Sequence, residues 1–314
     1  MKKRLFFSAQ VVLLSLCIGS LFVLVFQLSG NFNPLARFDH AKPSYNRIEA
    51  YDPSLARLNS LTKLRQYCDS IYSEQVFTGK SAGFENVYTD IVSSVVRDRF
   101  FHGYSYYSFE DNYMAAMLSK VTVPGLSALV IPDEILKYPY AACSQQAIVM
   151  MELLQSKGFK TRKIAFDDKT IYGGHFAFEV FYEGKWHFHD PDMEPDKTVL
   201  TNYGRPGIDF LVHNKDILLQ AYHRYSQQEI VAVFSSYSYG AVNKFPAPKA
   251  AIFQKVTRFL SYTIWLFFFI AFILVRRKYS RFAKKNLLNR KFSVAHIQQE
   301  KSSPYYPGYT AQGA

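Results

Sequence analysis

Two long apolar stretches lie near the two ends of the chain. Residues 5–28 contain no charged residue, and residues 259–275 are also uncharged and include Trp265 and five phenylalanines. A helix needs about 20 mainly apolar residues to cross the hydrocarbon core of a bilayer. We therefore predict a transmembrane helix over residues 5–28 and a second, of near-minimal length, over residues 259–275.

Between these stretches, apolar residues recur at every third or fourth position in several segments, which is the spacing of a helix with one buried face. One such segment begins at Asp52-Pro53, an N-cap residue followed by proline, which is a favoured helix start. Helices are predicted over residues 52–71, 84–101, 111–120 and 216–234, and from Cys143 to just before Gly158.

Runs of aromatic and β-branched residues follow the helix that begins at Cys143. Strands are predicted over residues 160–166, 176–182 and 185–188, with a tight turn at Glu183-Gly184 between the last two. Residues 121–140 contain three prolines and are expected to form a loop. Helices followed by an antiparallel sheet indicate an α+β domain.

These patterns divide the chain into seven parts. We predict a short N-terminal segment (1–4), a transmembrane helix (5–28), a polar connector (29–50), a folded domain (51–245), a second connector (246–258), a second transmembrane helix (259–275) and a basic tail (276–314). The end of the tail, residues 302–314, is rich in proline, glycine and tyrosine and is expected to be disordered.

The positive charge is concentrated at the two ends. Of 37 lysines and arginines, three lie in residues 1–28 and nine in residues 276–314, and these two segments hold only one of the 25 acidic residues. Basic residues flank membrane helices on the cytoplasmic side, so both termini are expected in the cytoplasm and the central domain on the opposite side. The basic flanks suit anionic lipid head groups. The nearly neutral remainder gives no reason to expect a nucleic-acid partner.

The first apolar stretch also has the basic leader of a signal peptide, Lys2-Lys3-Arg4. It is longer than the usual signal, and no clear Ala-x-Ala cleavage motif follows it. An uncleaved anchor is therefore favoured over a cleaved signal.

Cysteine use favours a reactive site over a disulfide. Cys17 lies inside the first apolar stretch, which leaves only Cys68 and Cys143 in the exported part. A disulfide between them is an alternative in an oxidising compartment. Cys68, however, falls in a helical apolar pattern and is expected to be buried as a free thiol.

Cys143, His175 and Asp190 are the candidate catalytic residues. Cys143 lies where a proline-containing stretch changes to a helical pattern, and the unpaired N–H groups of a helix start favour the thiolate, which is the nucleophile. His175 opens one predicted strand and Asp190 follows the next. A hairpin would place them side by side, so that the carboxylate orients the imidazole and the imidazole accepts the thiol proton.

This arrangement resembles the transglutaminase-like, papain-related cysteine enzymes. The matching residues are Cys143, Gly174-His175 with Glu179, Trp186 and Asp190-Pro191, all within about residues 139–196. The chain departs from the family pattern at Ala142, where glycine is common, and in the Phe-Ala-Phe after His175, where Ala-Trp is expected. The resemblance implies a papain-like α+β domain, here held between two membrane helices.

The resemblance further implies acyl transfer or amide hydrolysis through a thioester, without a cofactor. Cys143 would attack a carbonyl, and its backbone N–H would stabilise the oxyanion. Tyr140 and Gln145 are candidates for a second oxyanion donor, and these two residues and Trp186 are the predicted substrate-binding residues. The expected location outside a bacterial-type membrane points to envelope peptides, proteins or glycoconjugates as substrates.

Two alternatives use the same segment differently. His187 and His189 share one face of a strand and, with His175, Asp192 or Glu194, offer ligands for zinc or manganese, although Asp190 points to the opposite face. We predict no metal because the ligand spacings of known zinc motifs are missing. The other alternative is a catalytically inactive module that binds a partner in a membrane assembly handling cell-surface polymers.

Overall fold

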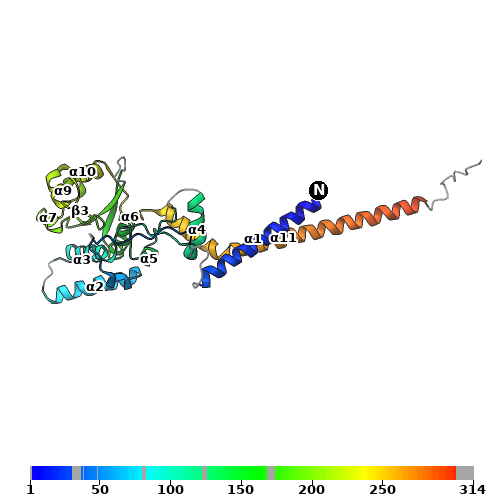
Figure 1. Cartoon of the computed structure of the whole chain (residues 1–314), viewed down its shortest axis with the longest axis horizontal. Helices are drawn as coiled ribbons and strands as arrows, with labels where there is room; N and C mark the ends of the chain where they lie inside the picture. Colours follow the sequence, from blue (N-terminus) through cyan, green and yellow to red (C-terminus); the bar gives the residue numbers. More distant parts are fainter. Residues whose placement is uncertain are drawn as a thin grey trace, which may run out of the picture. The chain divides into compact units, whose positions relative to one another are not determined.

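A computed structural model describes residues 2–29, 37, 39–47, 49–79, 83–121, 126–167 and 174–301 (Figure 1). The predicted disordered end, residues 302–314, lies outside the described residues, as does much of the first connector. The chain divides into two compact units. Residues 1–33 and 259–314 form one, and residues 34–258 form the other.

Two long helices carry the apolar stretches. α1 spans Lys2–Ser29 and α11 spans Pro248–Lys301. Both are long and apolar enough to cross a membrane. Large apolar side chains on them face outward, among them Leu5 (71% exposed) and Phe259 (59%). Such surfaces are stable in hydrocarbon and costly in water.

The helix α11 is longer than the sequence pattern indicates. It begins in the expected connector, with Pro248 in the first turn where proline is tolerated, and continues through the basic segment beyond residue 275. No glycine or proline follows Pro248 before the tail, so nothing in the sequence interrupts the helix. Within the first unit, the ring of Phe6 in α1 contacts the rings of Tyr279 and Phe282 in α11.

The N-terminal half of the domain is helical, as predicted, although one short helix, Pro132–Ile135, lies within residues 121–140, which we expected to form a loop. Its elements are η2 (Pro53–Arg57), α2 (Leu61–Phe77), α3 (Phe84–Arg99), α4 (Phe109–Val121), α5 (Pro132–Ile135) and α6 (Cys143–Ser156). The single helix predicted over residues 52–71 is wrong, because the chain breaks between η2 and α2. Asp52 caps the first piece and Ser60 the second, each accepting a backbone N–H.

A four-stranded antiparallel sheet follows, in the order β3-β2-β1-β4. The strands are β1 (Lys160–Phe166), β2 (His175–Tyr182), β3 (Lys185–His189) and β4 (Tyr237–Tyr239). The first three confirm the prediction. Glu183 and Gly184 both have positive φ, as a two-residue hairpin turn requires. The three residues of β4 are too few to produce a recognisable pattern.

The two faces of the sheet bury separate cores. Phe178 and Val180 of β2 face α6 and belong to the core under the N-terminal helices, whereas Ala177 and Phe188 belong to the core on the opposite face. That second face is covered by α7 (Lys197–Asn202), α8 (Ile208–His213), α9 (Lys215–Ala221) and α10 (Gln227–Val233), as Figure 1 shows. The helix predicted over residues 216–234 is in fact α9 and α10, and the Ser226 side chain caps α10.

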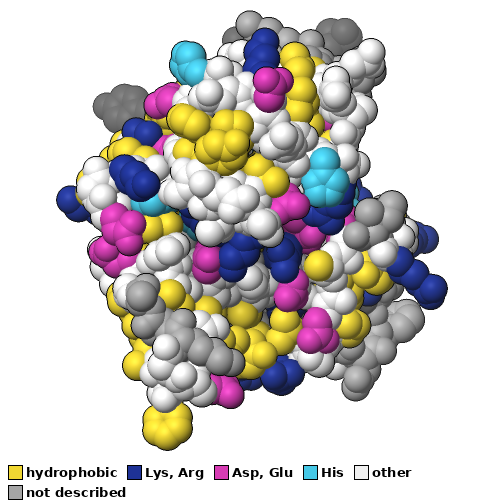
Figure 2. All heavy atoms as spheres, turned by 90° about the vertical axis from the view of Figure 1, so that its left-hand side faces the viewer, with side chains coloured by type: hydrophobic (Ala, Val, Ile, Leu, Met, Phe, Trp, Pro, Cys, Tyr) yellow, Lys and Arg dark blue, Asp and Glu magenta, His cyan; other side chains and the backbone are white. Residues whose placement is uncertain are grey.

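The outer face of the domain mixes both signs of charge. On the side shown in Figure 2, lysines and arginines are interspersed with aspartates and glutamates. This distribution agrees with the nearly neutral composition of the residues between the apolar stretches.

One buried amide fixes the start of α6. Gln145 Oε1 accepts hydrogen bonds from the backbone N–H groups of Ser105 (3.0 Å) and Ala142 (3.2 Å). Its Nε2 donates to the carbonyl oxygens of Ser105 (2.9 Å) and Leu129 (2.8 Å). All four hydrogen-bonding positions of the amide are therefore used. Gln145 joins two loops to the turn that carries Cys143.

A second glutamine ties α11 to the same loop. Gln254 Oε1 accepts the N–H of Val130 (3.1 Å), and Nε2 donates to the carbonyl of Ala128 (2.6 Å). Arg258, one turn later, pairs with Glu134 of α5. Residues 126–134 therefore lie between the first turns of α11 and the helix that carries Cys143.

Replacing Gln145 with alanine is predicted to destabilise the domain by about 3 kcal/mol, because several buried backbone groups lose their partners. Urea unfolding of the full chain in detergent micelles, followed by tryptophan fluorescence, measures this. The matched control is Gln155→Ala on the same helix, where a single bond to Thr161 is lost, with an expected cost of about 1 kcal/mol. Equal losses in the two variants would contradict this role of Gln145.

Candidate functional site

Cys143 is the first residue of α6, as predicted. Ala142 before it is extended, with φ −75° and ψ 167°, and the chain turns into the helix at the cysteine. No described residue accepts a hydrogen bond from the backbone N–H of Cys143. This N–H is one of the groups that a helix start leaves unpaired, and it adjoins the cleft that the thiol lines.

His175 and Asp190 form a buried pair beside the core on the face of the sheet opposite α6. His175 Nε2 lies 2.7 Å from Asp190 Oδ2, and the side chains are 7% and 0% exposed. His175 opens β2 and Asp190 directly follows β3, on the same face of the sheet. The predicted hairpin geometry is thus observed.

Two further donors hold the carboxylate of Asp190. The Tyr222 hydroxyl donates to Oδ2 (2.8 Å), and the backbone N–H of Met193 donates to Oδ1 (3.2 Å). Three donors to a carboxylate in the interior stabilise its charged form and fix its orientation. Burial and the neighbouring Asp190 charge raise the pKa of Tyr222 well above its usual value, so the phenol remains a donor.

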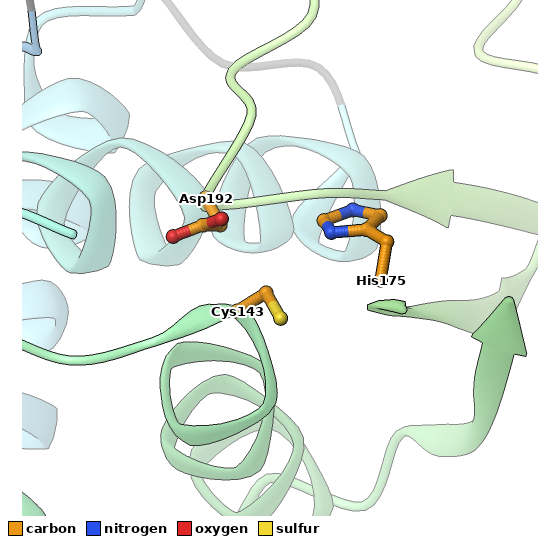
Figure 3. Close-up of side chains that lie close together, drawn as sticks. All are labelled: Cys143, His175 and Asp192. Atoms are coloured by element: carbon orange, nitrogen blue, oxygen red, sulfur yellow. The ribbon is translucent and has the colours of Figure 1, made fainter. Parts of the chain in front are cut away.

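The thiol and the imidazole meet at the mouth of a cleft. Cys143 Sγ, a ring nitrogen of His175 and a carboxylate oxygen of Asp192 all lie within 4.8 Å of one another. Figure 3 shows Cys143 at the start of α6 and His175 on its strand, with both side chains close to that of Asp192. The structure therefore brings Cys143, His175 and Asp190 into one connected group through the imidazole.

The surroundings favour a protonated imidazole at His175. Burial alone lowers its pKa, but the charge and hydrogen bond of Asp190, followed by the interaction with Cys143, raise the pKa of His175 well above its ordinary value of 6.5. An imidazolium beside a thiol is the arrangement in which a thiolate is stabilised by an adjacent positive charge.

The cleft has a volume of about 510 Å³ and is lined by polar and charged side chains. Besides Cys143 and His175, its walls include Glu49, His102 and Tyr104 from the helical half and Asp192, Met193, Glu194, Arg224, Tyr225 and Glu229 from the other half. Substrate-sized space thus opens at the thiol, and carboxylates predominate among the charged groups around it.

A second imidazole–carboxylate pair crosses this cleft. His102 Nδ1 and Gln146 Nε2 lie 2.8 Å and 3.0 Å from Asp192 Oδ1. The hydrogen bond to Asp192 raises the pKa of His102, although burial opposes it. Gly103 packs so closely on Pro43 that an added Cβ would lie 2.4 Å from the proline Cγ, which explains a glycine beside His102.

The three predicted substrate-binding residues do not line the cleft. Gln145 is occupied by its four backbone bonds. Tyr140 is 7% exposed and packs against Phe101 and Tyr138. Trp186 stacks under the guanidinium of Arg162, with its ring centre 4.3 Å from Cζ. Each of the three fixes local structure instead.

The alternative metal site built on His187 and His189 is not assembled. Both histidines face α6, on the side of the sheet opposite His175. The ring nitrogens of His187 lie near the carbonyl oxygens of Arg205 (2.8 Å) and Tyr182 (3.2 Å). His189 stacks on the Phe178 ring, and burial lowers its pKa well below the usual value.

The alternative disulfide is not formed either, because all three cysteines are free. Cys68 is fully buried in α2, as predicted. Burial raises the pKa of its thiol to about 12. Cys68 is therefore a core residue and provides an internal reference for the reactivity of Cys143.

Sequence reasoning missed His102 and Tyr222 as site residues and considered Asp192 only as a metal ligand. His102 and Asp192 are 90 positions apart, and no motif links them. Tyr222 follows a short helix whose apolar positions resemble any core-facing segment. Asp192 lies in the turn that follows β3, where strand alternation does not predict the direction of a side chain.

No protein-family model matches the chain, and comparisons with curated proteins and with solved structures gave no significant match. The chemistry of the site therefore has to be derived from its own geometry.

The raised pKa of His175 makes stability depend on pH. The unfolded chain releases this proton near pH 6.5, whereas the folded chain keeps it to higher pH, so the contribution is complete below pH 6.5 and is lost as pH rises through the raised value. The slope is at most about 1.4 kcal/mol per pH unit. Unfolding of the full chain between pH 6 and about 9, with EDTA present, measures it.

The His175→Gln variant should lack this component, so its stability falls less steeply with pH than that of the wild type. The variant His213→Gln, at an exposed histidine of α8, is the control and should keep the wild-type slope. Parallel pH profiles for wild type and His175→Gln would contradict the assignment.

Proposed function

We propose that the domain is a transglutaminase-like cysteine enzyme that performs acyl transfer or amide hydrolysis through a thioester. The observation that carries this proposal is the connected group Cys143–His175–Asp190 at the edge of a cleft. Supporting it, the nucleophile begins a helix and its two partners come from adjacent antiparallel strands, in the order that the family resemblance implies. A papain-like architecture is part of the same proposal.

The steps follow from the positions of the atoms. His175 takes the thiol proton, and the sulfur of Cys143 attacks the carbonyl carbon of the substrate. The tetrahedral intermediate collapses, the C–N or C–O bond breaks, and the imidazolium protonates the leaving group. Water or an amine then attacks the thioester with His175 as base, which restores the thiol. Asp190 keeps the imidazole in position throughout.

The oxyanion would be stabilised by the free backbone N–H of Cys143 and by the hydroxyl of Tyr104. Tyr104 lines the cleft. Burial, and next the neighbouring Cys143, raise the pKa of Tyr104, so the phenol keeps its proton and can donate. This replaces Tyr140 and Gln145, which are held elsewhere.

The location proposed from the sequence is a membrane with both termini cytoplasmic and the domain on the opposite side. The contacts of Phe6 with Tyr279 and Phe282 support only the part of this proposal that puts the two basic ends on the same side, because they join the start of α1 to the part of α11 that follows its apolar stretch. The proposed substrates are envelope peptides, proteins or glycoconjugates, and the basic flanks would lie against anionic lipid.

The test uses p-nitrophenyl acetate, an activated ester that needs no specific binding. Full-length protein in detergent with EDTA should release a burst of one p-nitrophenol per chain and carry an acetyl group on the peptide containing Cys143. Cys143→Ala should abolish the burst. His175→Gln should slow it by about 10²- to 10⁴-fold, the usual contribution of general acid–base catalysis.

Cys68→Ala is the matched control, because Cys68 is buried in the core, and it should keep the wild-type burst. A wild-type chain without a burst, or with acetylation spread over lysines at the rate of the denatured chain, would favour the inactive interaction module instead.

A further inference from the structure

Asp192 has no part in the proposed acyl chemistry, yet its carboxylate lies close to the sulfur of Cys143. The triad needs one carboxylate, and Asp190 supplies it from behind the imidazole. Asp192 comes instead from the cleft side, with an oxygen within 4.8 Å of both Cys143 Sγ and His175 (Figure 3). A carboxylate this close to a thiolate repels it. A protonated His175 offsets part of this repulsion, and a metal ion bonded to all three groups would offset it directly.

The orientation of Asp192 is fixed with one oxygen left available. Gln146 and His102 both bond to Oδ1, and the part of the chain that the structure describes offers Oδ2 no partner. Gln146 is 2% exposed and belongs to the same helix as Cys143. Asp192 Oδ2 and the Cys143 thiol therefore lie on neighbouring segments, which the hydrogen bond from Gln146 to Asp192 joins.

His175 is arranged in the same way. Its Nε2 is taken by Asp190, which leaves Nδ1 for the cleft. A histidine that ligates a metal usually bonds a carboxylate through its other nitrogen, and this pairing orients the ring and makes it a better ligand. The buried Asp190 supplies that partner.

We propose that Cys143 Sγ, His175 Nδ1 and Asp192 Oδ2 bind a zinc-like divalent ion, with a water from the cleft as fourth ligand, and that the bound ion blocks the nucleophile. Sulfur, imidazole and carboxylate together suit Zn²⁺. Bond lengths of about 2.0–2.3 Å place tetrahedral ligand atoms about 3.5 Å apart, so the side chains close by about 1 Å. Binding displaces the proton shared by thiol and imidazole.

Most of the other charged side chains that line the cleft are carboxylates, whose negative charge attracts a cation. Glu49 and Glu229 add carboxylates to its wall, whereas Arg224, its arginine, is bonded to Glu194. This site differs from the one considered from the sequence, because it uses neither His187 nor His189. The blocking effect rests on the proposed function, but the metal binding does not.

Cobalt is the probe, because a thiolate bound to Co²⁺ gives a charge-transfer band in the near ultraviolet. Full-length protein stripped with EDTA and then freed of chelator is titrated with Co²⁺ in detergent. The band should saturate at one ion per chain and disappear on addition of Zn²⁺. It should be absent in Cys143→Ala. Asp192→Asn should weaken Co²⁺ binding at least about tenfold, and Asp190→Asn about 10- to 100-fold.

Glu229→Gln is the control, because it removes a charge from the same cleft wall without removing a ligand, and it should weaken Co²⁺ binding much less than Asp192→Asn. A wild-type chain without the band overturns the inference. So does a band that persists in Cys143→Ala, or an Asp192→Asn variant that binds Co²⁺ as tightly as the wild type.

The acetyl burst separates this inference from the proposed function. A burst in EDTA that Zn²⁺ suppresses supports both. A burst without a cobalt band overturns the metal site alone. A cobalt band without any burst in EDTA overturns the proposed acyl chemistry and leaves the metal site standing.

Discussion

The buried carboxylate of Asp190 is the interaction on which the site depends. A charge in a protein interior is tolerated only when it is paired and hydrogen-bonded, and here an imidazole, a phenol and a backbone N–H converge on it. These donors come from β2, from the residue after α9 and from the turn after β3. The same contacts that satisfy the charge therefore join the sheet to its helical cover and set the direction of the His175 ring.

The site forms where the two cores meet. Cys143 begins a helix that packs on one face of the sheet, whereas His175 and Asp190 belong to the other face. Gln145 fixes the cysteine side through backbone groups only, and Tyr222 fixes the histidine side. The proposed reactive group therefore needs both halves of the domain, because one carries Cys143 and the other carries His175 and Asp190. The loop of residues 126–134, which hydrogen-bonds to both Gln145 and Gln254, also connects the cysteine side to the first turns of α11.

Local chemistry was predictable from the sequence, and long-range packing was not. The helix start at Cys143, the strands around His175 and the hairpin that brings Asp190 beside it follow from short patterns, and the structure has all of them. The pairing of His102 with Asp192 joins residues far apart in the chain. Trp186 shares its face of the sheet with Asp190, but only the fold shows that it packs on Arg162 and does not line the cleft. The helix breaks near Ser60 and Ser226 depend on caps that resemble ordinary polar positions.

The central claim is that His175 makes the Cys143 thiol reactive, and competitive alkylation with iodoacetamide tests it most directly. Each cysteine is compared with its own rate in the urea-unfolded chain, which removes differences in intrinsic reactivity. Folding should accelerate the reaction of Cys143 and strongly suppress that of Cys68, and His175→Gln should remove the acceleration without changing Cys68. A Cys143 that folding protects as it protects Cys68, with no response to His175→Gln, would contradict the account.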